Sequence, residues 1–523
     1  MRTKTVCILT AGKGTRMGKM SINLTKALHP IDSKAILSHI IDNFPEDFEF
    51  IIAIGYLKDQ VVRYLDFFYP DRDIKFVDVV NYDGPGSGPG HSLYCCKDHL
   101  QKPFYFVSCD TLWDNTIDLK DENDWLGVAK VSYEETKYYC NVKLKNKKIV
   151  GLKDKELIKD ESYQAFVGLC HIKNYKIFWD ALLNNRSIID AEKQISNGLV
   201  PLIEGGDVYA KTIEWTDVGD QSKYKKAIQK FENYDYSKTD ESLYILRNKV
   251  LKFFVNPEIS KNRVAKSLLN PKVFPEIRFH KENFYGYEFI KGKTLYEENN
   301  PVIFLNFLKW AKNNLWRKLD IEKSSFQECC NRFYREKTIE RLELFIEKYP
   351  DSNRRLVVNE KPIPALDDLL EQVPWEKFKD GGDPTFIHGD LQFDNIIYDS
   401  STDFFCLIDW RQDFGGVVEY GDLYYDLAKL YGGINLNYDL IKQNLMTYEE
   451  KKDSIFYDFA NRYQSKNYLN ILETFIIENN LDLIKVRLIV ALIYLNMSPL
   501  HHFPFDKMLF AIGLEKLNTE LNL

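Results

Sequence analysis

A short segment in the second half of the chain combines a histidine, carboxylates and an amide in an order that suits phosphoryl transfer. His388, Asp390 and Asn395 lie within eight residues, and Asp409 follows Asn395 by fourteen positions. Phosphoryl transfer needs one carboxylate that orients and deprotonates the attacking hydroxyl. It also needs an amide oxygen and a second carboxylate that hold Mg²⁺ against the phosphates. The segment therefore predicts a site for this chemistry.

A second group of residues near the N-terminus suits the binding of a nucleotide. Gly12, Lys13, Gly14, Thr15 and Arg16 directly follow the first predicted strand. Glycines let backbone N–H groups approach phosphates, and the lysine and arginine add positive charge. A tight turn between a strand and a helix would explain the glycines alone. Together the two groups predict two unrelated enzymes in one polypeptide.

Length and composition limit the class of protein. A chain of 523 residues is longer than one hydrophobic core usually supports, so we expect two or three domains. The net charge of −7 argues against a general binder of nucleic acid or anionic membranes. Nine cysteines without a Cys-x-x-Cys pair favour free thiols, and the longest apolar run, residues 488–495, is too short to span a bilayer. With no signal peptide at Met1, we expect a cytoplasmic protein without membrane insertion.

Hydrophobic patterning predicts how the elements that position these residues are arranged. Short apolar runs alternate with helical periodicity over residues 5–230, which favours a mostly parallel sheet flanked by helices. A polar segment at 233–242 is the predicted linker. Beyond it we expect a small strand-rich lobe at about 243–292 and a largely helical lobe at 293–523.

The N-terminal motif resembles the opening motif of the sugar-phosphate and phosphocholine nucleotidyltransferase family, L-x-A-G-x-G-x-R followed by a lysine. That lysine is Lys26, although Thr25 replaces the usual preceding proline. The resemblance implies a doubly wound α/β domain of the GT-A-like type over residues 1–232. It makes Arg16 and Lys26 catalytic, and Asp110 and Asp217 the ligands of Mg²⁺. Lys155 and Gly168 fall where the family contacts its phosphorylated acceptor.

A glycine-rich loop at residues 83–90 precedes Ser92. Ser92 could simply cap a helix, or the loop could pack against the nucleotide base, as the resemblance implies. The Ser-Leu-Tyr sequence after the loop and the short domain are similar to phosphocholine cytidylyltransferases. CTP is therefore the preferred nucleotide.

Residues 240–523 resemble the choline kinase and aminoglycoside phosphotransferase family, whose fold is a bilobal, protein-kinase-like α+β domain. The resemblance makes Asp390 the catalytic base, with His388 holding its loop. Asn395 and Asp409 would bind Mg²⁺, and Asp422 would brace the loop.

The small lobe carries fewer signals. Lys252 lies on a predicted strand and fits a lysine that reaches the phosphates of ATP, while Glu288 lies in a segment similar to the hinge that contacts adenine. No glycine-rich loop precedes Lys252, and Glu258 lies rather close to it for a helix glutamate.

The residues after Asp409 bear on the acceptor. Trp410 and Asp413 could form a cage for a quaternary ammonium group through cation–π attraction. Arg411 suits an anionic or polyhydroxylated acceptor better, and Trp410 could simply pack in the core.

These resemblances imply a bifunctional enzyme. The kinase would phosphorylate a small alcohol such as choline with ATP, and the transferase would couple the product to a nucleotide for decoration of surface glycans or lipids. A sugar 1-kinase with a sugar-1-phosphate nucleotidyltransferase is the alternative. One domain could instead be a non-catalytic binding module, and an antibiotic-modifying kinase fused to a scaffold ranks last.

Overall fold

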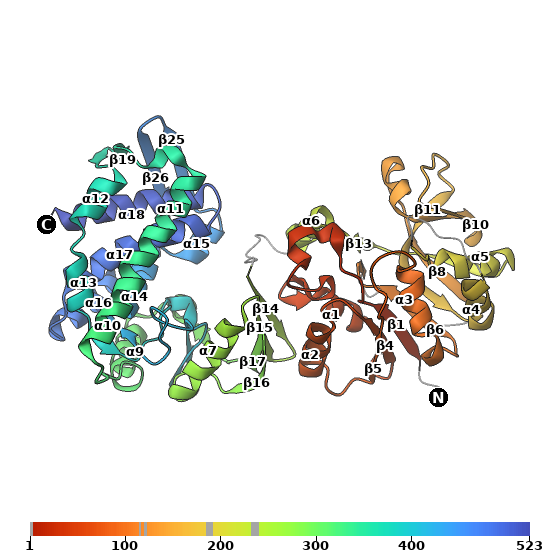
Figure 1. Cartoon of the computed structure of the whole chain (residues 1–523), viewed down its shortest axis with the longest axis horizontal. Helices are drawn as coiled ribbons and strands as arrows, with labels where there is room; N and C mark the ends of the chain where they lie inside the picture. Colours follow the sequence, from red (N-terminus) through yellow and green to blue (C-terminus); the bar gives the residue numbers. More distant parts are fainter. Residues whose placement is uncertain (1–3, 114–116, 120–122, 185–191, 232–239, 523) are drawn as a thin grey trace. The chain divides into compact units, whose positions relative to one another are not determined.

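The computed structural model describes residues 4–113, 117–119, 123–184, 192–231 and 240–522. Contacts divide the chain into two compact units, residues 1–255 and 256–523 (Figure 1). Within the predicted linker, residues 233–239 lie outside the described residues, and the domain limits stay a prediction.

A nine-stranded sheet forms the centre of the first unit, in the order β5-β4-β1-β6-β11-β8-β12-β10-β9. Its first four strands are parallel, as the alternation of strands and helices predicted. From β11 onward the sheet is mixed, because β11 runs antiparallel to β6, β8 and β9. The strands are β1 Thr5–Leu9, β4 Glu49–Ile54, β5 Ile74–Asp78, β6 Phe104–Ser108, β8 Asp124–Ala129, β9 Cys140–Lys145, β10 Lys148–Asp154, β11 Tyr163–Ile172 and β12 Val208–Thr212.

Both faces of this sheet are covered. Alternate residues of a strand point to opposite faces, and every residue of β1 and β4 is buried. On one face Phe104 and its neighbours pack against α3, α4 and α5, where Trp179 stacks on Phe104 at 5.6 Å. On the other face Phe44, just after α1, packs on Phe50 and Tyr105. The helices are α1 Ile36–Ile41, α2 Lys58–Phe68, α3 Pro89–Cys95, α4 Tyr175–Asn184, α5 Ser196–Glu204 and α6 Gln221–Phe231, and the 3₁₀ turns are η1 Thr15–Ser21, η2 Lys26–Leu28, η3 Lys97–His99 and η4 Tyr133–Tyr138.

Three smaller pairs of strands complete the first unit. β2 (Pro30–Ile31) pairs with β3 (Lys34–Ala35), and β7 (Thr111–Trp113) pairs with β13 (Trp215–Asp217). The third pair is the hairpin of β14 (Glu241–Leu246) and β15 (Lys249–Phe254).

The β14–β15 hairpin packs on the first unit through a buried tyrosine. Tyr244 meets Tyr64 edge-on at 5.0 Å and donates a 2.7 Å hydrogen bond to the carbonyl of Leu28. Lys249 donates to the carbonyl of Phe67 at 2.8 Å. The hairpin is thus tied to η2 and α2 by buried contacts.

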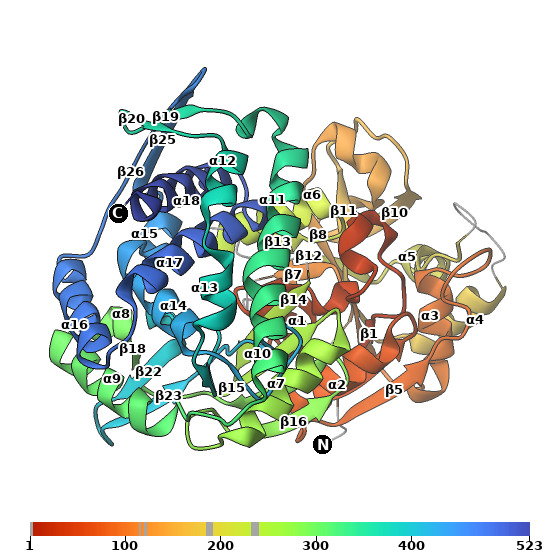
Figure 2. The same cartoon turned by 60° about the vertical axis from the view of Figure 1, so that its left-hand side comes forward.

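The second unit is mainly helical, with α14, α17 and α18 packed together at its centre (Figure 2). Its helices are α7 Pro257–Leu269, α8 Leu295–Glu298, α9 Pro301–Asn314, α10 Lys323–Cys330, α11 Lys337–Lys348, α12 Leu366–Gln372, α13 Trp375–Asp380, α14 Leu423–Asn435, α15 Tyr438–Lys442, α16 Ser465–Glu478, α17 Leu483–Met497 and α18 Phe505–Leu521. A π-helical turn, η5 (Asn331–Glu336), joins α10 to α11, and the 3₁₀ turns are η6 Pro350–Ser352, η7 Phe393–Asn395 and η8 Ser498–Leu500.

One helix of this unit has the length and apolar composition of a membrane span. The run at 488–495 was expected to be too short to span a bilayer, but the helical segment that contains it, Leu483–Leu500, is long and apolar enough to do so by length and composition alone. However, 61% of that window is buried inside the protein. This is the pattern of the core helix of a globular domain.

Short strands hold the loops of the second unit. β18 (Lys293–Thr294), β22 (Ile396–Asp399) and β23 (Phe404–Leu407) form one sheet, and β20 (Lys361–Ile363), β19 (Leu356–Val358), β26 (Ser454–Phe459) and β25 (Met446–Lys451) form another. β16 (Ile277–Lys281) pairs with β17 (Phe284–Glu288), and β21 (Pro384–Thr385) pairs with β24 (Gly421–Asp422). The segment with His388 and Asp390 lies between β21 and β22, so paired strands fix both of its ends.

Candidate active sites

Strand pairing brings the two aspartates of the first unit together. Asp110 lies between β6 and β7, and Asp217 is the last residue of β13. β13 runs antiparallel to β7 with Asp217 opposite Thr111, and the N–H of Val218 donates to the carbonyl of Asp110 at 3.0 Å. Residues more than a hundred positions apart thereby form one carboxylate site.

Cations surround Asp110. The Nζ of buried Lys26 lies 2.9 Å from Asp110 Oδ2 and 3.3 Å from the carbonyl oxygen of Gly219, while Arg16 lies 3.8 Å from the same carboxylate. Burial alone would raise the pKa of Asp110, but Lys26 and Arg16 outweigh burial and hold the pKa below its usual value. Asp110 is therefore ionised at neutral pH.

The sequence reasoning missed the partners of Asp217. Lys223 Nζ lies 2.6 Å from Asp217 Oδ2, and the hydroxyl of Tyr139 donates to the same oxygen at 2.6 Å. The backbone N–H of Gly219 donates to Asp217 Oδ1 at 2.7 Å. Lys223 lies in the first turn of α6, six residues after Asp217. This short separation in sequence is the feature from which the pairing could have been predicted.

The glycine motif forms a turn directly beside this site. Gly14 has φ +65°, and a Cβ there would lie 3.1 Å from the Cβ of Lys26, so the loop approaches the lysine closely. A Cβ on Gly12 would meet only open space, and Thr15 is exposed at the start of η1. Lys13 forms a 2.5 Å ion pair with Asp83. In this structure Lys13 therefore contacts the loop at 83–90 rather than Asp110 or Asp217.

The loop at 83–90 packs against residues 192–194. The N–H of Gly90 donates to the carbonyl of Lys193 at 2.7 Å, and the N–H of Lys193 donates to the carbonyl of Ser87 at 2.8 Å. Gly88, with φ +112°, occupies the N-cap position of α3, so Ser92 is not the cap. Ser92 is buried within that helix.

The two residues predicted to contact the phosphorylated acceptor, Lys155 and Gly168, are connected to the carboxylate site through different neighbours. The N–H of Lys155 donates to the carbonyl of Tyr139 at 2.9 Å, and Tyr139 contacts Asp217. Gly168 has φ +80°, and a Cβ there would lie 2.7 Å from the Oγ of Ser108. Only glycine fits at this position, where β11 lies beside the end of β6.

Magnesium fits the donor set of this site. Mg²⁺ prefers oxygen ligands and is commonly held by one or two carboxylates together with substrate phosphates. Asp110 and Asp217 supply two such carboxylates. Among the described residues no three His, Cys, Asp or Glu side chains cluster into a cage for a metal, so substrate phosphates would complete the coordination.

In the second unit, a buried carboxylate braces the predicted catalytic loop. Asp426 of α14 accepts hydrogen bonds from the N–H groups of His388 at 2.8 Å and Gly389 at 2.7 Å, and from Trp316 Nε1 at 3.1 Å. Burial raises the pKa of Asp426 to about 6, although these donors favour the ionised form. Asp422, which we expected to brace the loop, instead caps α14 and pairs with Lys485 at 3.2 Å.

His388 is held as a neutral imidazole. Burial lowers its pKa to about 4, so the ring carries one proton. Its Nδ1 accepts from the N–H of Asp390 at 3.1 Å, so its Nε2 donates to the carbonyl of Ile408 at 2.9 Å. The histidine therefore links the loop of Asp390 to the segment that leads into Asp409.

Asp390 faces a lysine that sequence reasoning missed. Lys429 Nζ lies 2.6 Å from Asp390 Oδ1, and Asn395 Nδ2 donates to the backbone carbonyl of Asp390 at 2.8 Å. Burial would raise the pKa of Asp390, but Lys429 outweighs burial and lowers it. Lys429 follows Asp426 by three residues on α14, so both side chains reach the loop from one face of the helix.

Helix α7 supplies cations to the other end of the loop. Arg263 forms a 2.5 Å ion pair with Asp409, whose φ is +56°. Lys266 donates to the carbonyl oxygens of His388 at 3.3 Å and Arg411 at 3.0 Å, and burial lowers its pKa to about 7. Asn395 and Asp409 offer the amide and carboxylate oxygens that suit Mg²⁺.

Lys252 lies on a strand, as predicted, and Glu288 ends another strand at the segment predicted to be the hinge. Lys252 is buried on β15 of the first unit, and Glu288 is the exposed last residue of β17 in the second. Glu258 lies in the first turn of α7 and pairs with Lys261 at 3.1 Å.

One predicted substrate contact is corrected. Trp410 is fully buried, packs on Phe274 at 4.6 Å and donates through Nε1 to the carbonyl of Arg263 at 2.7 Å. A side chain without exposed surface belongs to the core, so Trp410 cannot line a cage for a substrate. Arg411 and Asp413 are partly exposed.

Comparison with known proteins finds two different families in the two parts of the chain. Residues 6–117 match the family of MobA-like NTP transferase domains, and residues 313–453 match the phosphotransferase enzyme family. The bifunctional protein GlmU of Methanococcus vannielii is 26% identical over 222 residues, which cover 40% of this chain and 51% of that protein. The choline-phosphate cytidylyltransferase of Streptococcus pneumoniae is 32% identical over 113 residues, 21% of this chain and 45% of that protein.

A solved structure of UDP-glucose pyrophosphorylase complexed with UDP-glucose covers 44% of this chain and 99% of its own, at 17% identity and a TM-score of 0.39. The chain spans about half the length of the curated relatives named above. It carries a MobA-like nucleotidyltransferase domain followed by a domain of the phosphotransferase enzyme family.

Proposed function

We propose that the two domains catalyse consecutive reactions. The phosphotransferase domain phosphorylates a small alcohol with ATP, and the nucleotidyltransferase domain couples that phosphomonoester to an NTP, releasing pyrophosphate. The observation that carries this proposal is that each domain brings its predicted acidic residues together. Asp110 and Asp217 meet at paired strands, and Asp390 lies in a braced loop with Asn395 and Asp409 nearby in sequence.

In the phosphotransferase domain, Asp390 takes the proton of the acceptor hydroxyl as its oxygen attacks the γ-phosphorus of ATP. The bond from that phosphorus to the β–γ bridging oxygen breaks, and ADP leaves. Lys429 keeps Asp390 ionised for this task. Asn395 and Asp409 would hold Mg²⁺, which neutralises charge on the phosphates.

In the nucleotidyltransferase domain, a phosphate oxygen of the intermediate attacks the α-phosphorus of the NTP. The bond to the α–β bridging oxygen breaks, and pyrophosphate carries away the electron pair. Arg16 and Lys26 offset the charge of two approaching polyanions. Asp110 and Asp217 would hold Mg²⁺, which screens the same repulsion.

CTP is the first candidate for the NTP, supported by the similarity to a cytidylyltransferase named for choline phosphate. That similarity alone would make a choline-like alcohol the acceptor, with decoration of cell-surface glycans or lipids from the cytoplasm as the role. The charged side chains beside Asp390 decide whether the acceptor is cationic or anionic. The burial of Trp410 removes one side of the expected aromatic cage. A sugar substrate is the second candidate, favoured by a relative named UTP–glucose-1-phosphate uridylyltransferase AglF from Haloferax volcanii, 25% identical over 112 residues.

The test is an incubation of the full chain with ATP, CTP, UTP, Mg²⁺ and a pooled set of small alcohols and sugars, read by mass spectrometry. We expect a nucleoside diphosphate conjugate that requires ATP and disappears in the Asp390→Asn variant. A conjugate that forms without ATP, or that survives Asp390→Asn, would contradict the proposal.

A further inference from the structure

A group of cationic side chains lies beside the proposed catalytic base of the second unit. It consists of Lys337 and Arg341 on α11, Arg411 in the loop after Asp409, and Lys429 on α14. We refer to these four residues as the basic cluster. The aromatic ring of Phe333 joins two of them, with Lys337 Nζ 4.1 Å and the Arg411 guanidinium carbon 5.1 Å from its centroid.

The fold fixes these side chains next to Asp390. The N–H of Arg411 donates to the carbonyl of His388 at 3.1 Å. Gly389 directly precedes the base, and a Cβ on it would lie 2.7 Å from the Cβ of Arg411. Phe333 lies in the π-helical turn η5, a type of turn that is frequent at functional sites.

Two members of the cluster have no polar partner. Among the residues that the structure describes, the side chains of Lys337 and Arg411 form no ion pair and no hydrogen bond, and Arg411 Nε is buried without a partner. Arg341 donates to the carbonyl of Asn496 at 3.2 Å. Partial burial limits the hydration of these cations, so an anion bound beside them would be favourable.

The electrostatics of the cluster agree with this geometry. Burial, together with Arg411, Arg341 and Lys429, lowers the pKa of Lys337 well below its usual value, and Asp413 opposes that shift. The remaining carboxylates nearby have other partners. Asp390 is paired with Lys429, and Asp413 accepts from the N–H of Gly416 at 3.1 Å.

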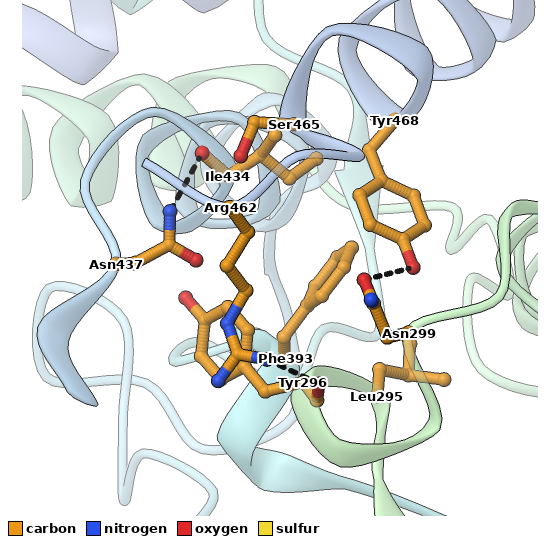
Figure 3. A pocket seen from close by; sticks show the side chains of 9 residues that line it. All are labelled: Leu295, Tyr296, Asn299, Phe393, Ile434, Asn437, Arg462, Ser465 and Tyr468. Atoms are coloured by element: carbon orange, nitrogen blue, oxygen red, sulfur yellow. Dashed lines mark hydrogen bonds between the residues drawn. The ribbon is translucent and has the colours of Figure 1, made fainter. Parts of the chain in front are cut away.

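An arginine elsewhere in the same unit shows the contrast. Arg462 lies in a pocket lined by Tyr296 and Phe393 (Figure 3). It donates to the carbonyl of Tyr296 at 2.7 Å and pairs with Asp439. Arg462 therefore has an anionic partner within the protein, although its Nε, like that of Arg411, is buried without a hydrogen bond. By contrast, no carboxylate among the described residues forms an ion pair with Arg411 or Lys337.

We propose that the basic cluster binds an anionic group of the acceptor, so that the acceptor is an alcohol carrying a carboxylate, phosphate or phosphonate rather than a quaternary ammonium. This inference rests on the proposed kinase function, because it places the acceptor at Asp390. Arg411 suits the task because a guanidinium pairs with two oxygens of such a group at once. A cationic alcohol such as choline would be repelled at the same place.

Calorimetric titration of the full chain tests this proposal, with saturating Mg²⁺ and ADP present to fill nucleotide sites. The probes are inorganic phosphate and choline, because unpaired cations take up a small oxyanion whatever the rest of the acceptor is. We expect phosphate to bind and choline not to bind. Arg411→Gln and Lys337→Met should each weaken phosphate binding at least tenfold.

The matched control is Arg335→Gln, which removes an exposed arginine from the same helical segment outside the cluster. It should leave phosphate binding unchanged, and circular dichroism checks that all variants are folded. Choline binding as tight as phosphate binding, no phosphate binding to the unaltered chain, or phosphate binding insensitive to both cluster variants would overturn the proposal. Binding that persists while no alcohol is phosphorylated would contradict only the proposed function, so the two failures are distinguishable.

Discussion

The two sites use the same charge arrangement but are built in opposite ways. In the first unit, Asp110 and Asp217 come from distant parts of the chain and meet through the pairing of β7 with β13. In the second unit, His388 and Asp390 lie in one continuous loop, which a single buried side chain, Asp426, holds from behind. In each unit a lysine pairs with a carboxylate of the proposed site. One site is therefore assembled by long-range strand pairing, and the other is a continuous loop that Asp426 braces.

The largest effects should come from removing a carboxylate from one site only. Asp217→Asn should lower nucleotidyl transfer about 10³-fold, because it removes a proposed metal ligand and the partner of Lys223. Phosphorylation of the acceptor should stay within about twofold of the unaltered chain. The measurement is the rate of each half-reaction with purified protein. Equal loss of both reactions would show that the sites are not independent.

A smaller effect should follow from removing the partner of the kinase base. Lys429→Met should lower kcat for phosphorylation about 10²-fold. It should also raise the pKa of Asp390, because burial then acts without the opposing lysine. The acid limb of the pH–rate profile should consequently move to higher pH. A profile that keeps its position would mean that Lys429 does not tune the base.

Asp426, which braces the loop, should make the stability of the second unit depend on pH. The pKa of Asp426 rises from an ordinary 3.8 to about 6. The folded protein therefore holds this proton more tightly than the unfolded chain does. The contribution of Asp426 to the free energy of unfolding should fall by about 3 kcal/mol as pH rises from about 4 to about 6, then stay level.

Urea unfolding of the unaltered chain and of Asp426→Asn across this pH range checks that prediction through the difference in their free energies of unfolding.

In the first unit, the contribution of Glu49 to the free energy of unfolding should change with pH in the opposite direction. The pKa of Glu49 is lowered to about 2, because Lys102, Lys75 and Thr5 outweigh its burial. Its contribution should be present above about pH 4.5 and be lost as pH falls toward 2. If the difference in the free energy of unfolding between the unaltered chain and Asp426→Asn did not change with pH, the raised pKa of Asp426 would be contradicted.

The smallest effect concerns the hairpin that packs on the first unit. Tyr244→Phe removes a buried hydrogen bond to the carbonyl of Leu28 and leaves that oxygen without its donor. We expect the free energy of unfolding of the first unit to fall by about 1–2 kcal/mol. Scanning calorimetry of the full chain measures this. An unchanged first unit would show that the hairpin does not stabilise it.

The same contrast decides how much could be predicted from sequence. The loop around Asp390 is contiguous, so its spacing alone indicated the chemistry. Asp110 and Asp217 could be placed together only by resemblance to a family, because the pairing of β7 with β13 is a long-range contact. Lys223, Lys429 and Arg263 were missed for a related reason, since isolated lysines and arginines on helices look like surface residues until the fold shows what they face.

Burial was the other property that the sequence did not supply. A tryptophan after Asp409 fits a substrate cage and a core position equally well by type, and only the packing on Phe274 shows that Trp410 belongs to the core. The exchange of roles between Asp422 and Asp426 has the same origin. Both lie at the start of α14, and the direction of each side chain decides which one meets the loop of His388.

The most direct test of two consecutive active sites is a transfer of product between variants. The Asp110→Asn variant, given ATP, CTP, UTP, Mg²⁺ and the alcohol found in the pooled screen, should accumulate the phosphomonoester and form no nucleotide conjugate. The purified phosphomonoester, given to Asp390→Asn with CTP or UTP and no ATP, should then be converted to the conjugate with release of pyrophosphate. Failure of Asp390→Asn to convert it, or formation of the conjugate by Asp110→Asn alone, would contradict the account.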